Sequence, residues 1–173
     1  MKLPFTKRTP VLDKKDVNVL LVCMGNICRS PMAHGVLAKL LQDELLHDLV
    51  AVDSAGTHAY HVGEPPDSRA QLTAQRRGVD LSTLRARRVD VSDFEHFDYV
   101  LAMDRDNFDI LMSLCPDEHV GKVRLFMEFA PDWREHEVPD PYYGGPAGFE
   151  RVFDMVEAAA RGLLEDIRRR HGL

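Results

Sequence analysis

The 173-residue sequence has only three cysteines and no long apolar run. A small, odd number of cysteines argues against the disulfide framework of a secreted domain and favours a reducing, cytoplasmic setting. No apolar segment reaches the roughly 20 residues that a membrane-spanning helix needs, so we expect no insertion into a membrane. Residues 1–16 also lack the apolar core of a signal peptide, so we expect no secretory leader.

The sequence also lacks an excess of basic residues. There are 22 lysines and arginines against 28 aspartates and glutamates, which gives a net charge of −6. A general nucleic-acid-binding protein needs a basic surface, and this balance argues against one. Among the eight histidines, His58 and His61 lie close together but have no third ligand nearby. We therefore expect neither a metal nor another cofactor.

The most informative stretch is residues 17–31, where a strand pattern, a short loop and a helix start follow one another. Residues 19–22 are all valine or leucine and carry no charge, which is typical of a strand buried on both faces of a parallel sheet. A helical pattern runs from residue 31 to about residue 46. It opens on a proline, and Ser30 before it is the expected N-cap.

This strand–loop–helix arrangement is suited to binding an anion beside a nucleophile. A loop that enters a helix presents backbone N–H groups and the positive end of the helix dipole. Gly25 and Asn26 are residue types that reach unusual backbone angles, which lets those N–H groups turn inward. The same field favours a thiolate at Cys23. Arg29 offers a planar fork of donors for two phosphate oxygens, so the pattern predicts phosphoryl transfer through a cysteinyl-phosphate. The alternative is a buried strand cysteine and an unrelated surface arginine.

Strand and helix patterns alternate along the rest of the chain. Apolar runs predict strands at 49–54, 97–103 and 123–129, and helical spacing predicts helices at 69–77, 105–114 and 147–170. This order predicts one α/β domain at residues 17–173, with a four-stranded parallel, doubly wound sheet flanked by helices. Ligands of such sheets bind beyond the carboxyl ends of the strands, which is where Cys23 and Asp104 fall.

Two basic segments have competing interpretations. Residues 1–16 are predicted to be a mobile basic extension, either without a role or docking acidic partners. Its charged residues are Lys2, Lys7, Arg8, Lys14 and Lys15 against Asp13 and Asp16. A second cluster is interpreted as a solvated face, the alternative being an electrostatic rim for anionic substrates. It consists of Arg76, Arg77, Arg85, Arg87 and Arg88.

Two motifs in this sequence resemble those of a known family. Residues 22–33, Val-Cys-Met-Gly-Asn-Ile-Cys-Arg-Ser-Pro-Met-Ala, resemble the signature of the low-molecular-weight protein tyrosine phosphatases, the acid-phosphatase type. Residues 140–143, Asp-Pro-Tyr-Tyr, resemble the family's second signature. The resemblance covers about residues 17–169. It implies hydrolysis of phosphotyrosine-containing proteins, with a bacterial tyrosine kinase as an implied partner.

The resemblance implies three catalytic residues. Cys23 is the expected nucleophile, and Arg29 the expected phosphate clamp. Asp140 is expected to protonate the departing oxygen and then to act as the base for water. Pro139 and Pro141 restrict its backbone, although Asp-Pro also starts ordinary turns.

The other expected site residues form the phosphate-binding loop and its rim. Ile27 favours phosphotyrosine, because the related arginine phosphatases have a threonine there. Tyr142 and Tyr143 are expected either to pack against an aryl ring or to be phosphorylated themselves. The expected binding residues are Met24, Gly25, Asn26, Ile27, Cys28, Ser30, Tyr60, Tyr142 and Tyr143.

The resemblance also implies supporting roles. Asn26, Ser30 and Ser54 are expected to form a hydrogen-bond network that holds the loop and eases departure of the thiolate. Asp104 is expected to orient Arg29. The family's histidine near the end of the second helix is absent, and Arg77 stands in its place.

The other two cysteines are Cys28 and Cys115. Cys28 shares a tight loop with Cys23, and we expect the pair to form a reversible disulfide that protects the nucleophile. The alternative is that Cys28 is a small packed side chain. Cys115 has no expected partner.

Three other functions share parts of the pattern. A thiol arsenate reductase has the same fold and loop, but the cysteine pair expected after the second helix is absent. An aspartyl phosphatase could use Asp104-Arg105-Asp106 with magnesium, although Asn107 replaces the expected threonine or valine. The last alternative is an anion-binding module without catalysis.

Overall fold

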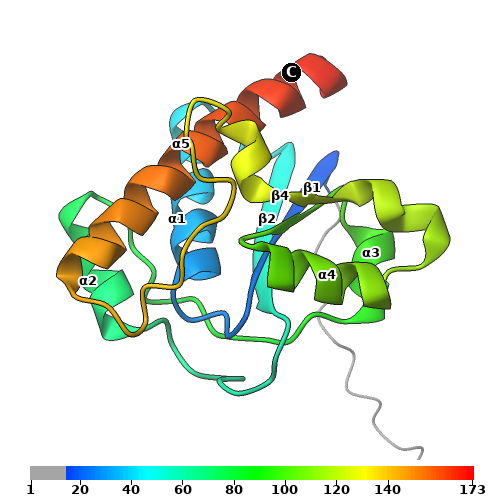
Figure 1. The fold of residues 1–173 in the computed structure, drawn as a ribbon. Coiled ribbons are helices and arrows are strands. Elements are labelled where there is room, and N and C mark those ends of the chain that lie inside the picture. Colours follow the sequence, from blue (N-terminus) through cyan, green and yellow to red (C-terminus); the bar gives the residue numbers. More distant parts are fainter. Residues whose placement is uncertain (1–14) are drawn as a thin grey trace, which may run out of the picture.

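The centre of the molecule is a parallel sheet of four strands in the order β2-β1-β3-β4, as predicted. The strands are β1 (Val17–Cys23), β2 (Val50–Gly56), β3 (Tyr99–Ala102) and β4 (Val123–Leu125). The structure is a computed structural model that describes residues 15–173 (Figure 1). Nearly all of the predicted basic extension, residues 1–16, lies outside the described residues.

Helices cover both faces of this sheet (Figure 1). The helices are α1 (Arg29–Asp43), α2 (Ser68–Arg76), α3 (Val91–His96), α4 (Arg105–Leu114) and α5 (Pro146–His171). Helices α1, α2 and α5 pack together on one side, whereas α3 and α4 lie on the other. In residues 15–173, no helix combines the length and apolar character needed to cross a membrane.

The central strand β1 shows why this architecture forms. Its side chains alternate between two buried faces because successive residues of a strand point in opposite directions. Val19 and Leu21 pack toward α1 and α5, while Leu20 and Val22 pack toward α3 and α4. Every residue of β1 is therefore buried, as the uncharged apolar run predicted.

Most predicted bounds differ from the structure by one to three residues, and two elements differ in a way that has a physical reason. The apolar run 123–129 forms a strand only over Val123–Leu125 and then turns into a 3₁₀ helix, Phe126–Phe129. The run is apolar because Phe126 and Met127 are buried in the core, and not because it is extended. The helix expected from residue 31 begins at Arg29. The short helices α3 and Asp117–Lys122 were not predicted at all.

Candidate active site

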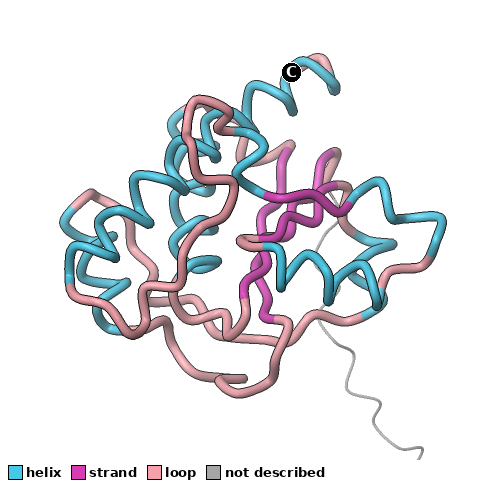
Figure 2. The backbone as a smooth tube through the Cα atoms, viewed as in Figure 1, coloured by secondary structure: helices cyan, strands magenta, loops and turns pink. Residues whose placement is uncertain are grey.

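A pocket of about 240 Å³ lies at the carboxyl end of the sheet. The loops that follow β1 and β2 run below the strands in Figure 2, and the loop before α5 reaches the same end. The pocket is lined by Cys23, Met24, Gly25, Ile27, Cys28, Arg29, Tyr60, His61, Asp140, Tyr142 and Tyr143. The fold thus brings together side chains that are more than a hundred residues apart in the sequence.

The loop from Cys23 to Arg29 bends around the sulfur of Cys23. Asn26 has a φ of 56°, in the left-handed region, and its backbone N–H lies 3.2 Å from Cys23 Sγ. We expected an unusual backbone at both Gly25 and Asn26, but Gly25 is not left-handed. Its missing side chain makes room instead for His61, whose ring carbon Cδ2 would lie 3.0 Å from an added Cβ.

The hydroxyl of Ser30 is the second neighbour of the Cys23 sulfur. Ser30 Oγ lies 3.0 Å from Cys23 Sγ, and Asn26 Nδ2 donates to the same oxygen at 2.8 Å. Because Ser30 accepts from the amide, its own proton is available to the sulfur. The prediction that Ser30 caps the helix is wrong: the N-cap is Cys28, and Ser30 is the second residue of α1. The Ser30 hydroxyl forms a hydrogen bond with the Cys23 sulfur and does not cap the start of the helix.

The guanidinium of Arg29 is buried, and hydrogen bonds to Asp104 and Val138 hold it in place. Its NH1 donates to Asp104 Oδ2 at 2.5 Å and to Val138 O at 3.1 Å, and only 4% of the side chain is exposed. Burial by itself would lower the pKa of Arg29, but the surrounding negative charges, Cys23 and Asp104 above all, raise it above its usual value. Arg29 is thus a fixed positive charge at the base of the pocket.

The carboxylate of Asp140 lies at the pocket mouth, where 37% of its side chain is exposed. Its Oδ1 accepts a hydrogen bond from the backbone N–H of Tyr142 at 3.0 Å, and its Oδ2 lies 3.9 Å from Arg29 NH2. The rings of Tyr142 and Tyr143 meet edge to face, with centroids 5.0 Å apart. An acid and two aromatic rings therefore border the same opening.

The side chain of Asp104 has partners on both oxygens. Oδ2 accepts from Arg29, and Oδ1 accepts from the backbone N–H of Asn107 at 2.8 Å, which caps helix α4. This arrangement suits orientation of Arg29. It argues against the aspartyl phosphatase alternative, in which an oxygen of Asp104 would have to attack phosphorus.

Ser54 and Arg77 lie elsewhere than expected. In the described part of the chain, no hydrogen bond joins Ser54 to Asn26 or Ser30; Ser54 Oγ lies 3.0 Å from His34 Nδ1. Arg77 contacts helix α5, where it pairs with Asp154 at 2.6 Å. The expected network of three residues is thus a pair, Asn26 and Ser30. Arg77 makes no hydrogen bond or ion pair with this pair in the described residues.

Three contacts around the site were not predicted from the sequence. His34 bonds Ser54, and burial lowers the pKa of His34, which keeps the ring neutral near pH 7. His61 lines the pocket and lies 2.7 Å from Glu64. Arg69 NH1 donates to Tyr142 O at 3.0 Å. Of these three, only the place of His61 in the pocket could have been predicted, because His61 is adjacent in the sequence to Tyr60, an expected binding residue.

The described cysteines, Cys23, Cys28 and Cys115, are all free thiols. Burial raises the pKa of the Cys28 thiol well above its usual value, and the nearby Asp67 and Cys23 add to that rise. Cys28 is therefore a thiol near neutral pH. Within residues 15–173, no group of three or more histidine, cysteine or carboxylate side chains could hold a metal ion.

Comparison with known proteins gives consistent matches over nearly the whole chain. The model of the low molecular weight phosphotyrosine protein phosphatases matches residues 18–172. A low molecular weight protein-tyrosine-phosphatase of Streptomyces coelicolor is 43% identical over 153 residues, which are 87% of this chain and 93% of that protein.

Solved structures agree with this match. A protein tyrosine phosphatase from Entamoeba histolytica has a TM-score of 0.85 at 42% identity and covers 90% of this chain and 98% of its own. Wzb of Vibrio vulnificus, solved in complex with benzylphosphonate, has a TM-score of 0.76 at 29% identity. That match covers 87% of this chain and 98% of Wzb.

Proposed function

The chain belongs to the low molecular weight phosphotyrosine protein phosphatases and is a protein-tyrosine-phosphatase, and we propose that it works through a cysteinyl-phosphate formed on Cys23. One observation carries this mechanism. The Cys23 sulfur lies at the pocket with two hydrogen-bonding neighbours, Asn26 N–H and Ser30 Oγ. Arg29 and Asp140 line the same pocket.

In the first step the Cys23 sulfur attacks the phosphorus of the substrate, and the bond between phosphorus and the phenolic oxygen breaks. Asp140 gives its proton to that oxygen, so that a neutral phenol departs. Arg29 and the backbone N–H groups of the loop hold the phosphoryl oxygens, whose charge is largest in the transition state. In the second step water attacks the cysteinyl-phosphate, Asp140 takes the proton from water, and phosphate leaves. The Ser30 hydroxyl stabilises the thiolate that is released.

The pocket wall supports phosphotyrosine as the group that binds. Ile27, Tyr60, Tyr142 and Tyr143 offer apolar and aromatic surface above the anion site. Wzb, solved in complex with benzylphosphonate, is a related protein that binds a phosphonate carrying a benzyl group. We propose phosphotyrosine-containing proteins as substrates, with an autophosphorylated tyrosine kinase as one candidate.

The three free thiols support a reducing, cytoplasmic setting, which a thiolate nucleophile also requires. Within the proposal, Cys28 protects Cys23 from oxidation. Peroxide would convert the Cys23 thiolate to a sulfenic acid, and the Cys28 thiol would then condense with it to a disulfide and release water. A thiol reductant would restore both cysteines.

Acid-quenched turnover tests the mechanism. Wild-type protein is mixed with a phosphotyrosine peptide in EDTA, quenched within milliseconds, digested and analysed by mass spectrometry. We expect full activity in EDTA and a phosphate on the peptide that contains Cys23. Phosphate on Asp104 and loss of activity in EDTA would instead support the aspartyl phosphatase. Arsenate reduction coupled to a thiol would support the reductase, and binding without cleavage would support the anion-binding module.

Replacing Asp104 by asparagine tests how Arg29 is oriented. Asparagine is as good an N-cap as aspartate, so helix α4 keeps its cap while Arg29 loses its charged partner. Because a small misplacement of a catalytic group costs up to about 10²-fold in rate, we expect kcat for an aryl phosphate to fall by about 10- to 100-fold. The melting temperature should change little. A kcat equal to that of the wild type would remove Asp104 from this role.

A further inference from the structure

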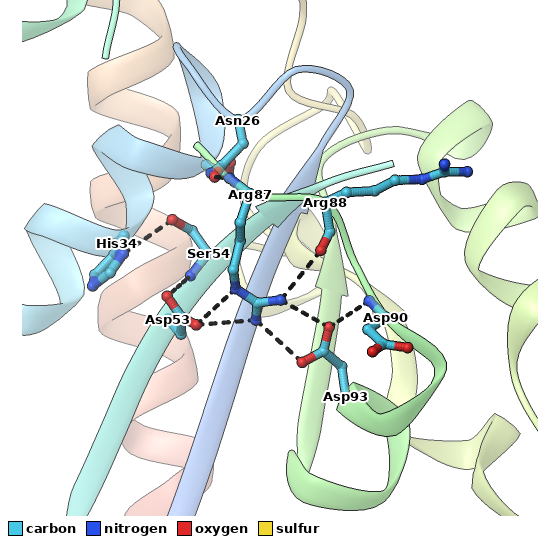
Figure 3. Close-up of polar contacts among 9 residues, drawn as sticks. Asn26, His34, Asp53, Ser54, Arg87, Arg88, Asp90 and Asp93 are labelled. Atoms are coloured by element: carbon cyan, nitrogen blue, oxygen red, sulfur yellow. Dashed lines mark hydrogen bonds and ion pairs between the residues drawn. The ribbon is translucent and has the colours of Figure 1, made fainter. Parts of the chain in front are cut away.

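Arg87 does not belong to the solvated face that the sequence predicted for the basic cluster. Its guanidinium lies between Asp53 of β2 and Asp93 of α3 (Figure 3). Nε donates to Asp53 Oδ2 at 3.0 Å, and NH1 and NH2 reach the two oxygens of Asp93 at 3.0 and 3.2 Å. Burial opposes the charge, but the two carboxylates raise the pKa of Arg87 above its usual value. The neighbouring Arg88 differs: its side chain is exposed and points away from Asp53 and Asp93.

The backbone of Arg87 contacts the phosphate-binding loop directly. Its N–H donates to Asn26 Oδ1 at 3.1 Å (Figure 3). The same segment is tied to the end of β2, because Gly56 N donates to Arg87 O and Val89 N donates to Gly56 O, each at 2.8 Å. The ion pairs and these backbone bonds together fix where the N–H of Arg87 points.

Both ends of the Asn26 amide are therefore engaged. Oδ1 accepts from Arg87, while Nδ2 donates to Ser30 Oγ, which lies against the Cys23 sulfur. An amide held at both ends cannot flip, so Nδ2 must face Ser30. Asn26 is 2% exposed and has a left-handed backbone, a conformation that its surroundings must hold in place.

We propose that Arg87 is a positioning residue for the nucleophile, acting through Asn26 and Ser30 on the Cys23 sulfur. Arg87 does not line the pocket, so it is not placed to contact the substrate. Ser54 is connected to the same group of ion pairs. The N–H of Ser54 donates to Asp53 Oδ1 at 2.8 Å, and the hydroxyl of Ser54 forms a hydrogen bond with His34 (Figure 3). Ser54 thus supports the loop through Asp53 and Arg87, and not through direct contact with Asn26.

The test compares Arg87→Met with Arg77→Met. Arg77 is a matched control because it also pairs with several carboxylates, those of Glu150, Asp154 and Glu157, and lies over the ring of Phe153 at 4.2 Å. In the described part of the chain, it makes no hydrogen bond or ion pair with the loop. Each variant is measured for kcat and KM with an aryl phosphate, for melting temperature, and for the rate at which iodoacetate alkylates Cys23.

We expect Arg87→Met to lower kcat about 10-fold and to slow alkylation of Cys23 by a similar factor, with KM within about threefold of the wild type. Arg77→Met should keep kcat and alkylation within about twofold, whatever it does to the melting temperature. Alkylation does not depend on turnover, so this readout separates the inference from the proposed mechanism. Phosphate found on another side chain would overturn the mechanism, whereas unaltered Cys23 reactivity in Arg87→Met would overturn the role of Arg87.

A double-mutant cycle with Asn26→Ala tests the route of the effect. If Arg87 acts through Asn26, adding Arg87→Met to Asn26→Ala should lower kcat by less than about twofold. Losses that multiply in the double variant would contradict the inference. Should Arg87→Met fail to fold, Asp53→Asn removes one side of the clamp while its side-chain oxygen can still accept from Ser54 N–H. That variant should lower kcat and Cys23 alkylation in the same direction, and wild-type values would overturn the proposal.

Discussion

Replacing Cys23 by serine is expected to lower hydrolysis of an aryl phosphate by roughly 10⁴-fold or more, because loss of a nucleophile removes the covalent route. The serine hydroxyl would occupy the same place beside Asn26 N–H and Ser30 Oγ. Among the described residues, no carboxylate or imidazole hydrogen-bonds to that position, so none is placed to take its proton, and a hydroxyl is not ionised near neutral pH. Binding of substrate should survive, since Arg29 and the loop N–H groups are unchanged.

Single-turnover kinetics and phosphopeptide binding measure the two parts of this prediction. The matched control is Cys115→Ser. Cys115 is also a buried free thiol, but it packs on the opposite face of the sheet, and its sulfur donates to Pro116 O. That variant should keep kcat within about twofold, since its site lies outside the pocket. A Cys23→Ser protein that retains a tenth of wild-type activity would disprove the cysteinyl-phosphate.

Local sequence patterns were enough to predict the parts of the site that follow from single strands and helix starts. The run 19–22 is apolar on every residue, which only a central strand requires, and the loop after it must therefore open at the carboxyl edge. The end of β3 brings Asp104 to the same edge, and the helix start places Arg29 beside Cys23. Each of these inferences needs only strand and helix periodicity and the rule for parallel sheets.

Contacts between distant segments could not be predicted in this way. Arg77 and Arg87 belong to one basic cluster in the sequence, yet one pairs with helix α5 and the other with Asp53 and Asp93. Which carboxylate meets which arginine depends on how β2, α3 and α5 are packed, and charge spacing carries no information on that. The solvated-face interpretation describes Arg76, Arg85 and Arg88, which are exposed. Arg77 is half-buried and pairs with exposed carboxylates of α5, and the interpretation is wrong for Arg87, which pairs with the largely buried Asp53 and Asp93.

The partner of Ser54 was missed for the same reason. His34 follows a helix pattern in the sequence and has no motif around it, so nothing marks it as a hydrogen-bonding partner. Its ring meets Ser54 only because α1 packs against β2. Likewise, Gly25 was expected to supply a left-handed backbone, whereas its use is to leave space for His61, 36 positions further along the chain.

Replacing Asp140 by asparagine is expected to slow phenyl phosphate hydrolysis by about 10²- to 10⁴-fold, the usual contribution of general acid catalysis. Asparagine keeps an oxygen that can accept from Tyr142 N–H, so the turn between Pro139 and Pro141 should be preserved. What it loses is the proton for the departing oxygen. A phenol with strongly electron-withdrawing substituents needs no such proton, so the loss should shrink to a small factor with that substrate.

A series of aryl phosphates with increasingly acidic phenols measures this dependence. The wild type should show a weak dependence of single-turnover rate on phenol acidity, and Asp140→Asn a steep one, because negative charge then develops on an unprotonated oxygen. Asp132→Asn is the control: Asp132 is an exposed acid in the same segment before α5 and has no hydrogen bond in the described part of the chain. An equal loss for every phenol would mean that Asp140 only shapes the pocket, since a binding or folding defect does not distinguish leaving groups, whereas proton donation must.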